Sequence, residues 1–323
     1  MRAEGEWVIA VDVGGTQIRA ALCDRAGTID RRASDLTRDE EGAERIMRRI
    51  LQAIAAVWPP TGRPAAIGIS APGPLDPWTG VILRCQNIAA WDGYPLRAAI
   101  EERVGVRAAL GKDTNLAALA EWRLGAGQGT SHMIYLTLST GVGSGIIVDG
   151  RLLLGAQGIA AEAGCMIIQP DGPACTCGNH RGCLESLASG PAIAREARQR
   201  LAAGEPSCLT ELAGGDTEAI SAKTVHQAAR LGDALACDVL RRAGEALGIA
   251  LVNLAHLFNP QLFVIGGSVS KAGDLILEPA RQVLRTHTIV DLFWRQTPVV
   301  TAALGDDVGL IGAALLAWDV CAA

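Results

Sequence analysis

Three glycine-rich segments, each at the end of an apolar strand-like run, are the first features of this sequence that suggest ligand binding. They are Asp12-Val13-Gly14-Gly15-Thr16, Ser139-Thr140-Gly141-Val142-Gly143 and Gly266-Gly267-Ser268. Glycine lets the backbone approach an anion closely, and nearby hydroxyl groups add hydrogen-bond donors. A plain tight turn is the better explanation of any one segment alone, but three such segments together favour phosphate binding. None has the spacing G-x-x-x-x-G-K-[ST], so they do not form a Walker-type loop.

Two aspartates lie where a carboxylate could take part in such binding. Asp12 is at the end of the first strand-like run, where it could hold Mg²⁺ directly or through water. An aspartate at this place also commonly caps a turn. Asp113 opens a helical pattern directly after a strand, which is a typical N-cap position but also the end of an α/β sheet where ligands bind. The residues alone leave both roles open for both aspartates.

The nine cysteines indicate free thiols or a metal site more than disulfides. Their number is odd, and the acidic N-terminus does not resemble a secretory signal, so we expect a reducing, cytoplasmic compartment. Cys175, Cys177 and Cys183 place three thiols within nine residues, and a fourth ligand would complete a tetrahedral zinc site. Reduced cysteines without a metal are the alternative for this loop.

Composition and charge exclude several classes of protein. The 323 residues suffice for two domains with separate cores. Although 49% of the residues are hydrophobic, no uncharged apolar run approaches the roughly 20 residues of a membrane-spanning helix. The net charge is −5 and the basic residues are scattered, so there is no basic face for nucleic acid. We therefore expect a protein that acts on small molecules, away from membranes.

Apolar patterns predict the elements that position these residues. Strands that alternate with helices indicate an α/β fold, and the segment 125–130 is the clearest break in composition, near which a domain boundary is expected. A strand, glycine turn and strand recur around residues 12–15 and 139–145, which is too faint a repeat to establish a duplication. The expected strands are residues 7–13, 17–23, 27–33, 65–70, 106–110, 131–139, 145–148 and 261–265. The expected helices are residues 38–57, 95–104, 113–124, 191–203, 224–231 and 233–258, and a last one from 306 or 307 through 318.

In their order along the chain, these motifs resemble the ROK (repressor, open reading frame, kinase) family, and within it the sugar kinases, especially bacterial glucokinases. DVGGTQIRAAL resembles the family's first phosphate motif, DTNLAALAEW its catalytic-base segment, and STGVGSGIIVDGRLLLGAQGIAAEAG its signature. APGPLD and NIAAWDGYPL resemble its sugar-side loops, CTCGNHRGCLES its zinc motif, and LFVIGGSVSKAG its adenosine motif. The resemblance covers nearly the whole chain, and the ordered combination is far more specific than any single glycine pair.

The resemblance implies an actin/hexokinase-like (ribonuclease H-like) α/β fold with ATP, Mg²⁺ and a sugar in the cleft between two domains. The small domain would comprise residues 1–112 and 306–323, and the large domain residues 113–305. Asp113 would be the general base, and the residues that bind the sugar would be Asn87, Asp113, Glu162 and Glu185. The residues that bind the nucleotide would be Asp12, Gly14, Gly15, Thr16, Thr140, Gly141, Gly266 and Gly267. Relatives also suggest a homodimer.

The cysteine loop departs from the family pattern in one ligand. Relatives have a zinc-binding His that also touches the sugar, and the matching residue here is Cys165. The last cysteine pair is also spaced one residue wider, with His180 inside the insertion. The resemblance therefore implies a structural zinc site with His180 as an alternative ligand to one of four cysteines, which are Cys165, Cys175, Cys177 and Cys183.

Lys112 is a second departure, because relatives usually have Asn directly before the catalytic aspartate. The ammonium group of a lysine has no acceptor to offer a sugar hydroxyl. A cation there would also lower the pKa of Asp113 and weaken it as a base, unless Lys112 points to solvent. Lys112 and Cys165 put the identity of the sugar in question more than the reaction.

The function we expect is ATP-dependent phosphorylation of a hexose at its 6-hydroxyl, most simply of glucose to glucose 6-phosphate. Kinases for N-acetylmannosamine, N-acetylglucosamine or fructose are the nearest alternatives. Repressors of the family carry a helix-turn-helix domain before the first phosphate motif, whereas that motif starts here at Asp12, and the acidic balance also disfavours DNA binding. A sugar-binding sensor with a degraded kinase site is favoured only by Lys112 and Cys165.

Overall fold

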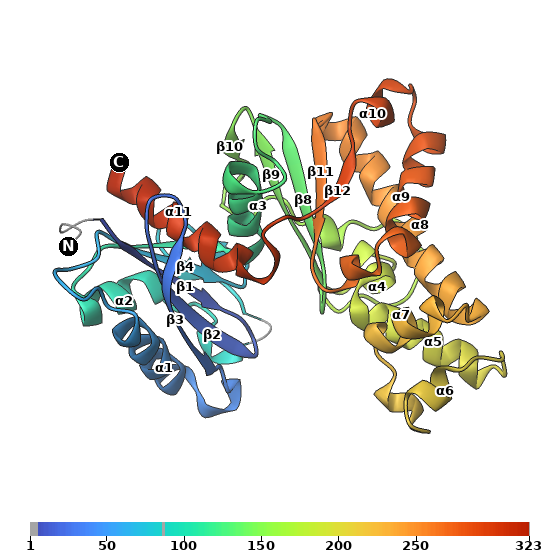
Figure 1. Cartoon of the computed structure of the whole chain (residues 1–323), viewed down its shortest axis with the longest axis horizontal. Coiled ribbons are helices and arrows are strands. Elements are labelled where there is room, and N and C mark those ends of the chain that lie inside the picture. The colour runs from blue at the N-terminus through green and yellow to red at the C-terminus, as the bar shows by residue number, and fades with distance from the viewer. Residues whose placement is uncertain (1–5, 86–87, 323) are drawn as a thin grey trace.

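Two five-stranded sheets, one in each lobe, organise the chain in the computed structural model, which describes residues 6–85 and 88–322 (Figure 1). The first sheet has the strand order β3-β2-β1-β4-β7 and the second the order β10-β9-β8-β11-β12. Each consists of an antiparallel meander followed by two parallel strands. The two sheets therefore share one topology, which supports the internal repeat that the sequence alone does not establish.

The strands β1, β4 and β7 of the first sheet are buried on both faces, whereas its edge strand β3 is mostly exposed. Its strands are β1 (Val8–Val13), β2 (Gln17–Cys23), β3 (Ile29–Leu36), β4 (Ile67–Ala71) and β7 (Ala108–Lys112). Ile9 and Val11 pack on the side of the helices α1 (Ala43–Ala56) and α2 (Leu96–Val104), whereas Val8 and Ala10 pack on the side of α11 (Val308–Ala322). Since neighbouring residues of a strand face opposite sides, β1 needs apolar residues throughout. A two-stranded hairpin follows β4 and consists of β5 (Leu75–Asp76) and β6 (Val81–Ile82).

The second sheet carries most of the helices on one face. Its strands are β8 (Met133–Leu138), β9 (Val142–Val148), β10 (Arg151–Leu152), β11 (Leu262–Gly266) and β12 (Val299–Thr301). The helices whose apolar residues share its largest core are α4 (Leu184–Ala188), α5 (Gly190–Ala202), α7 (Ala222–Arg230), α8 (Ala234–Phe258) and α9 (Asp274–His287). Two short helices, α6 (Leu209–Leu212) and α10 (Leu292–Arg295), lie at opposite ends of this lobe (Figure 1).

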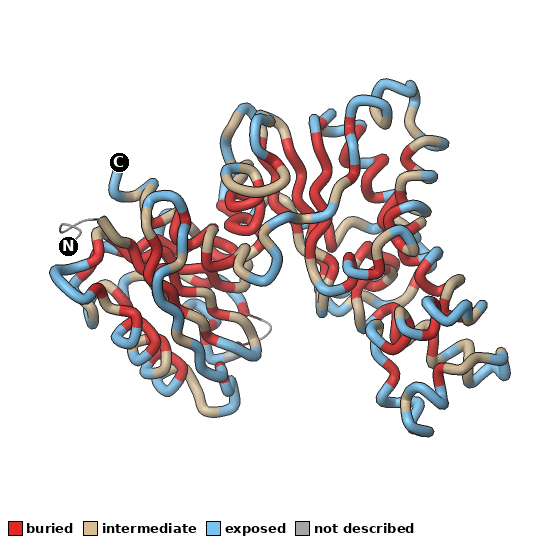
Figure 2. Tube along the Cα trace, viewed as in Figure 1, coloured by how far each residue is buried: buried red, intermediate tan, exposed pale blue. Residues whose placement is uncertain are grey.

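Helix α3 (Asp113–Leu124) lies between the two lobes. It follows β7 of the first sheet directly. Ala117 and Ala118 pack against the second sheet, whereas Leu116 and Ala120 pack with α11. Figure 2 shows buried chain running through both sheets and along α3. The N-terminus of α3, with Asp113, is therefore fixed where the lobes meet.

Most predicted elements are confirmed, and β2 and α3 have the predicted bounds. The predicted helix 38–57 is wrong at its start, because Asp39–Glu41 form a separate 3₁₀ turn and α1 begins only at Ala43. Gly42 between them has a φ of 86°, outside the helical region. Helix α9 is absent from the predicted set, and it carries Pro279 inside it.

In the described part of the chain, no helix is both long and apolar enough to cross a membrane.

Candidate functional site

A cavity of about 560 Å³ opens beside the N-terminus of α3 and the turn between β8 and β9. The three carboxylates Asp113, Glu162 and Glu185 all line it, together with Thr140 and Gly141 of the second glycine-rich segment. These residues come from four different parts of the chain. The structure thus brings the predicted sugar carboxylates and part of the predicted nucleotide loop into one site.

Asp113 is held at the start of α3, where its Oδ1 accepts a hydrogen bond from the backbone N–H of Thr114 at 2.7 Å. Burial raises the pKa of its carboxyl to about 6, even though the Lys112 ammonium and the Thr114 N–H lower it. The nearby carboxylates of Asp12 and Glu162 raise it further. A carboxyl group with a pKa near 6 is ionised at neutral pH and is a better proton acceptor than an ordinary aspartate.

Lys112 does not point to solvent. Its side chain is 9% exposed, and its Nζ forms an ion pair with Oε1 of Glu162, whose side chain is 42% exposed. The predicted lowering of the Asp113 pKa by this cation is present, but the rise caused by burial is larger. The predicted effect of Lys112 is therefore confirmed in direction, but burial and not Lys112 sets the net direction of the pKa of Asp113.

Glu185 lies in the first turn of α4, and both of its carboxylate oxygens are held. Oε1 accepts a hydrogen bond from the Thr176 hydroxyl at 2.8 Å, and Oε2 accepts one from the backbone N–H of Val142 at 3.0 Å. A Cβ atom on Gly141 would lie 2.7 Å from Oε2. Glycine at this position therefore allows the turn to approach the carboxylate.

The second and third glycine-rich segments adjoin each other. They follow β8 and β11, which are parallel neighbours in the second sheet. The hydroxyl oxygens of Ser139 and Ser268 lie 3.2 Å apart. Gly266 ends β11 and Gly267 follows it, so both lie at the same sheet edge as Thr140. Two of the three predicted phosphate segments thus form one surface.

The first glycine-rich segment belongs to the other lobe. Asp12 is the last residue but one of β1. Its Oδ1 accepts a hydrogen bond from Ser70 at 2.7 Å, and its Oδ2 accepts one from Nε of Arg19 at 3.1 Å. Among the described residues, Asp12 and residues 14–16 do not line the cavity at Asp113, to which the first lobe contributes residues 72–74 and Lys112. The role of this segment in binding the nucleotide stays a prediction.

A second cavity, of about 440 Å³, adjoins the third glycine-rich segment. It is lined by Ser268 and Lys271 on one side and by Lys223 and His226 of α7 on the other. Neither residue of α7 was predicted as a site residue. Their spacing of three, which places both on one side of a helix, is the signal that the sequence offers. The sequence motifs therefore miss the α7 wall of this cavity.

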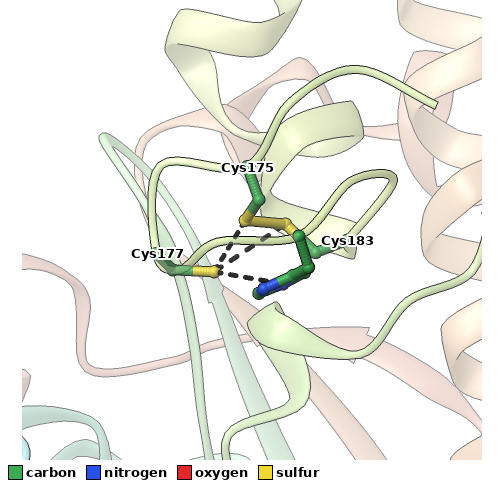
Figure 3. A group of neighbouring side chains, drawn as sticks. Cys175, Cys177 and Cys183 are labelled. Carbon is green, nitrogen blue, oxygen red and sulfur yellow. Dashed lines mark hydrogen bonds between the residues drawn. A yellow bond between two sulfur atoms is a disulfide. The ribbon is translucent and has the colours of Figure 1, made fainter.

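The cysteine loop gathers four potential metal ligands. The ligand atoms of Cys175, Cys177, His180 and Cys183 all lie within 4.8 Å of one another. Figure 3 shows the three cysteine sulfurs turned toward one another. The Cys177 sulfur lies 2.7 Å from that of Cys175 and 3.8 Å from that of Cys183. The Nε2 atom of His180 is 3.8 Å from the Cys177 sulfur. The structure therefore assembles the set with His180.

Two features of this loop differ from the expectation. Cys165 lies outside the group of four and lines the larger cavity together with Cys177, and burial raises the pKa of its thiol to about 12. Cys175 and Cys183 are joined by a disulfide, whereas reduced cysteines were expected (Figure 3). Because zinc binds thiolates, the disulfide and a zinc site that uses these two sulfurs exclude each other.

Asn87 lies outside the described residues, so its predicted contact with the sugar stays a prediction. Trp91, in the same loop, is fully buried and stacks with Tyr94 at 6.0 Å between ring centroids. It is a core residue in this structure.

Comparison with known proteins matches this architecture to one family. The ROK family model matches residues 8–320. A glucokinase from Thermotoga maritima is 37% identical over 95% of this chain and 96% of its own length. The crystal structure of a ROK family glucokinase from Streptomyces griseus, in complex with glucose and AMPPNP, is 39% identical with a TM-score of 0.84, and the match covers 97% of this chain and 99% of that chain.

A transcriptional regulator is also similar in structure. The crystal structure of a ROK family regulator, a homologue of the E. coli MLC protein, is 28% identical with a TM-score of 0.85. The match covers 98% of this chain but 78% of that chain. The match to the kinase structure therefore leaves little of either chain uncovered, whereas the match to the regulator leaves about a fifth of the regulator uncovered.

The two lobes, with their repeated sheet topology, form the actin/hexokinase-like α/β fold that the resemblance implied. The family match extends through both lobes and includes every segment that lines the two cavities. The chain belongs to the ROK family.

Proposed function

We propose that this chain, an ATP-dependent sugar kinase, transfers the γ-phosphate of ATP to the 6-hydroxyl of a hexose, with glucose as the expected substrate. The observation that carries this proposal is the convergence of Asp113, Glu162 and Glu185 on one cavity with the turn at Thr140 and Gly141. Carboxylates accept hydrogen bonds from sugar hydroxyls, and backbone N–H groups in a glycine-rich turn suit phosphate oxygens.

In the proposed reaction Asp113 accepts the proton of the 6-hydroxyl. The hydroxyl oxygen forms a bond to the γ-phosphorus while the bond from that phosphorus to the ADP oxygen breaks. Glu162 and Glu185 hold other hydroxyls, so that the 6-hydroxyl points at Asp113. This orientation and the base are the main contributions that a protein makes to phosphoryl transfer.

Asp12 is the residue that would hold Mg²⁺, which when bound neutralises charge on the ATP phosphates. Ser70 and Arg19 donate three hydrogen bonds to its carboxylate, which has about four acceptor sites. The remaining capacity suits a water on Mg²⁺ better than direct ligation.

The nucleotide would lie along the surface shared by the second and third glycine-rich segments. Thr140, Gly141, Gly266 and Gly267 would hold the phosphates, and the cavity beside Ser268 has room for the adenosine. Residues 14–16 would reach the phosphates from the other lobe when the lobes close. Such closure would also expel water that could hydrolyse ATP.

A coupled assay of ADP release across hexoses and N-acetylhexosamines tests the proposed function. We expect the highest kcat/KM with glucose and no turnover without a sugar. A preference for N-acetylmannosamine, N-acetylglucosamine or fructose would keep the reaction and change the substrate. Binding of a sugar without ADP release would instead support a non-catalytic sensor, the function that the Lys112 and Cys165 substitutions favour.

We also propose that the cysteine loop holds a structural Zn²⁺. Three sulfurs and one imidazole nitrogen within 4.8 Å are a donor set typical of structural zinc. This arrangement supports His180, rather than Cys165, as the fourth ligand. The site would hold the loop between Glu162 and Glu185 in shape.

Protein purified with a reductant and without a chelator is expected to contain about one zinc per chain by elemental analysis. His180→Ala should lose zinc to a chelator faster than the wild type, and Cys165→Ala should not. The reverse ranking would make Cys165 the fourth ligand.

Counting thiols distinguishes the zinc form from the disulfide form. Denatured without reductant, the zinc form should show nine reactive thiols, whereas the disulfide form should show seven. Zinc-free protein with seven thiols would contradict the metal site.

The remaining parts of the proposal follow from the sequence and from relatives. We propose a cytoplasmic homodimer that binds neither nucleic acid nor membranes, in line with the net charge of −5. Its small domain would consist of residues 1–112 and 306–323 and its large domain of residues 113–305.

A further inference from the structure

Glu185 connects two segments that are distant in the sequence. The Thr176 hydroxyl donates a hydrogen bond to Oε1 at 2.8 Å, and the Val142 N–H donates one to Oε2 at 3.0 Å. Thr176 lies between Cys175 and Cys177, two members of the group of potential metal ligands. Val142 is the first residue of β9, directly after the glycine-rich turn. Glu185 is thus fixed between the cysteine loop and that turn.

Two neutral donors from the described residues therefore orient Glu185. Glu162 differs, because it pairs with the ammonium group of Lys112. The Val142 N–H restrains the carboxylate at Oε2 and the Thr176 hydroxyl restrains it at Oε1, so the two together limit its rotation more than either does alone. The orientation of one of the carboxylates that line the cavity consequently depends on a residue that does not itself line it.

We propose that Thr176 is a positioning residue for sugar recognition. Its hydroxyl holds Glu185 in the orientation that binds a sugar hydroxyl, and it joins this carboxylate to the cysteine group. The proposal rests on the proposed function, since it assigns Glu185 to the sugar. Thr176 donates this hydrogen bond in the structure that has the Cys175–Cys183 disulfide, so the orientation of Glu185 does not require a bound metal.

The test replaces Thr176 by valine, which has the same shape but no hydroxyl. We expect Thr176→Val to raise both the dissociation constant of the sugar, measured by calorimetry, and the KM for the sugar by about fivefold. This is the effect of losing one hydrogen bond worth about 1 kcal/mol. The value of kcat and the KM for ATP should change less than about twofold, and Thr176→Ser should restore sugar binding. The matched control is Thr286→Val on α9, where the hydroxyl donates to backbone carbonyls of its own helix. It should behave as the wild type.

Zinc content and the unfolding temperature of each variant separate positioning from a structural role. Thr176→Val should keep both. Unchanged sugar affinity in Thr176→Val, or loss of zinc or of thermal stability by this variant, would each overturn the proposal. A wild type that binds no hexose would overturn the proposed function as well, whereas an active wild type with an equally active valine variant overturns only the role of Thr176.

Discussion

Asp113→Asn is expected to lower kcat by about 10³-fold while it changes the dissociation constant of the sugar less than about threefold. A general base contributes about 10² to 10⁴ to the rate, and asparagine cannot accept the proton of the attacking hydroxyl. The amide has the same shape as the carboxyl and still forms hydrogen bonds with a hydroxyl group. The two quantities are measured by coupled ADP release and by calorimetry with the sugar.

The pH dependence of kcat/KM in the wild type also tests Asp113 as the base. Burial raises the pKa of Asp113 to about 6, so kcat/KM should be level above that pH and fall about tenfold per unit below it. The fall occurs because the protonated carboxyl cannot take a further proton. In Asp113→Asn the residual rate should lack this fall. Lys112→Met should move the fall to higher pH, because the ammonium lowers the pKa of Asp113 while Asp12 and Glu162, which raise it, remain.

A surface aspartate provides the control. Asp149 in the hairpin between β9 and β10 has a side chain that is 85% exposed, and Asp149→Asn should change neither kcat nor the pH profile. If Asp113→Asn kept kcat within tenfold of the wild type, Asp113 would not be the base. A fall in the wild-type profile near pH 4 would mean that the carboxyl is well solvated when the enzyme works.

The sequence predicts well those features that depend on a pattern within neighbouring residues or on motifs in a fixed order along the chain. The strand at β1 is a continuous apolar run that ends at a glycine pair, and both the run and the turn are visible in neighbouring residues. Helix α3 follows a strand and begins at a polar residue, and its predicted bounds are confirmed. The family was recognised because several such motifs occur in a fixed order, and the family match confirms it.

The features that the sequence does not predict depend on partners that are distant along the chain. Lys112 could point to solvent or inward, and its partner Glu162 is fifty residues away. The choice between Cys165 and His180 depends on how the loop folds back on itself. The second cavity needs α7 to lie opposite the third glycine-rich segment. The spacing of Lys223 and His226 indicates a shared helix face but not what that face lies against. Tertiary packing decides each of these positions.

Glu121 is another residue whose hydrogen-bond partners are distant along the chain. In the sequence it looks like an ordinary polar residue near the end of α3, but in the structure it is fully buried. Its carboxylate accepts three backbone hydrogen bonds, from Ala126 at 2.9 Å, Ala303 at 3.1 Å and Leu304 at 2.8 Å. Ala303 and Leu304 belong to the connection from β12 to α11, the segment that returns the chain from the second lobe to the first (Figure 1). One buried carboxylate thus fixes this connection to α3.

Glu121→Ala is therefore expected to destabilise the protein by about 4 kcal/mol, because three buried N–H groups lose their acceptor and each unpaired group costs about 1 to 3 kcal/mol. The unfolding temperature, measured by scanning calorimetry, should fall by roughly 8 °C or more. Glu121→Gln should also destabilise, because its NH₂ group brings a donor to N–H groups that need an acceptor. The matched control is Glu218→Ala, whose side chain is 84% exposed beside Arg198 and whose loss should shift the unfolding temperature by about 1 °C or less.

Glu121→Ala also tests whether the hydrogen bonds of Glu121 fix the connection from β12 to α11 in place. Since Glu121 fixes residues 303 and 304 just before α11, its loss should increase hydrogen exchange first at the backbone amides of that connection and of residues 125–127. Exchange in β1 and β8, within the two sheets, should rise later, at denaturant concentrations closer to global unfolding. An unfolding temperature equal to that of the wild type would mean that water or another group satisfies the three N–H donors. Faster exchange spread evenly over both lobes would mean that Glu121 supports global stability without fixing this connection.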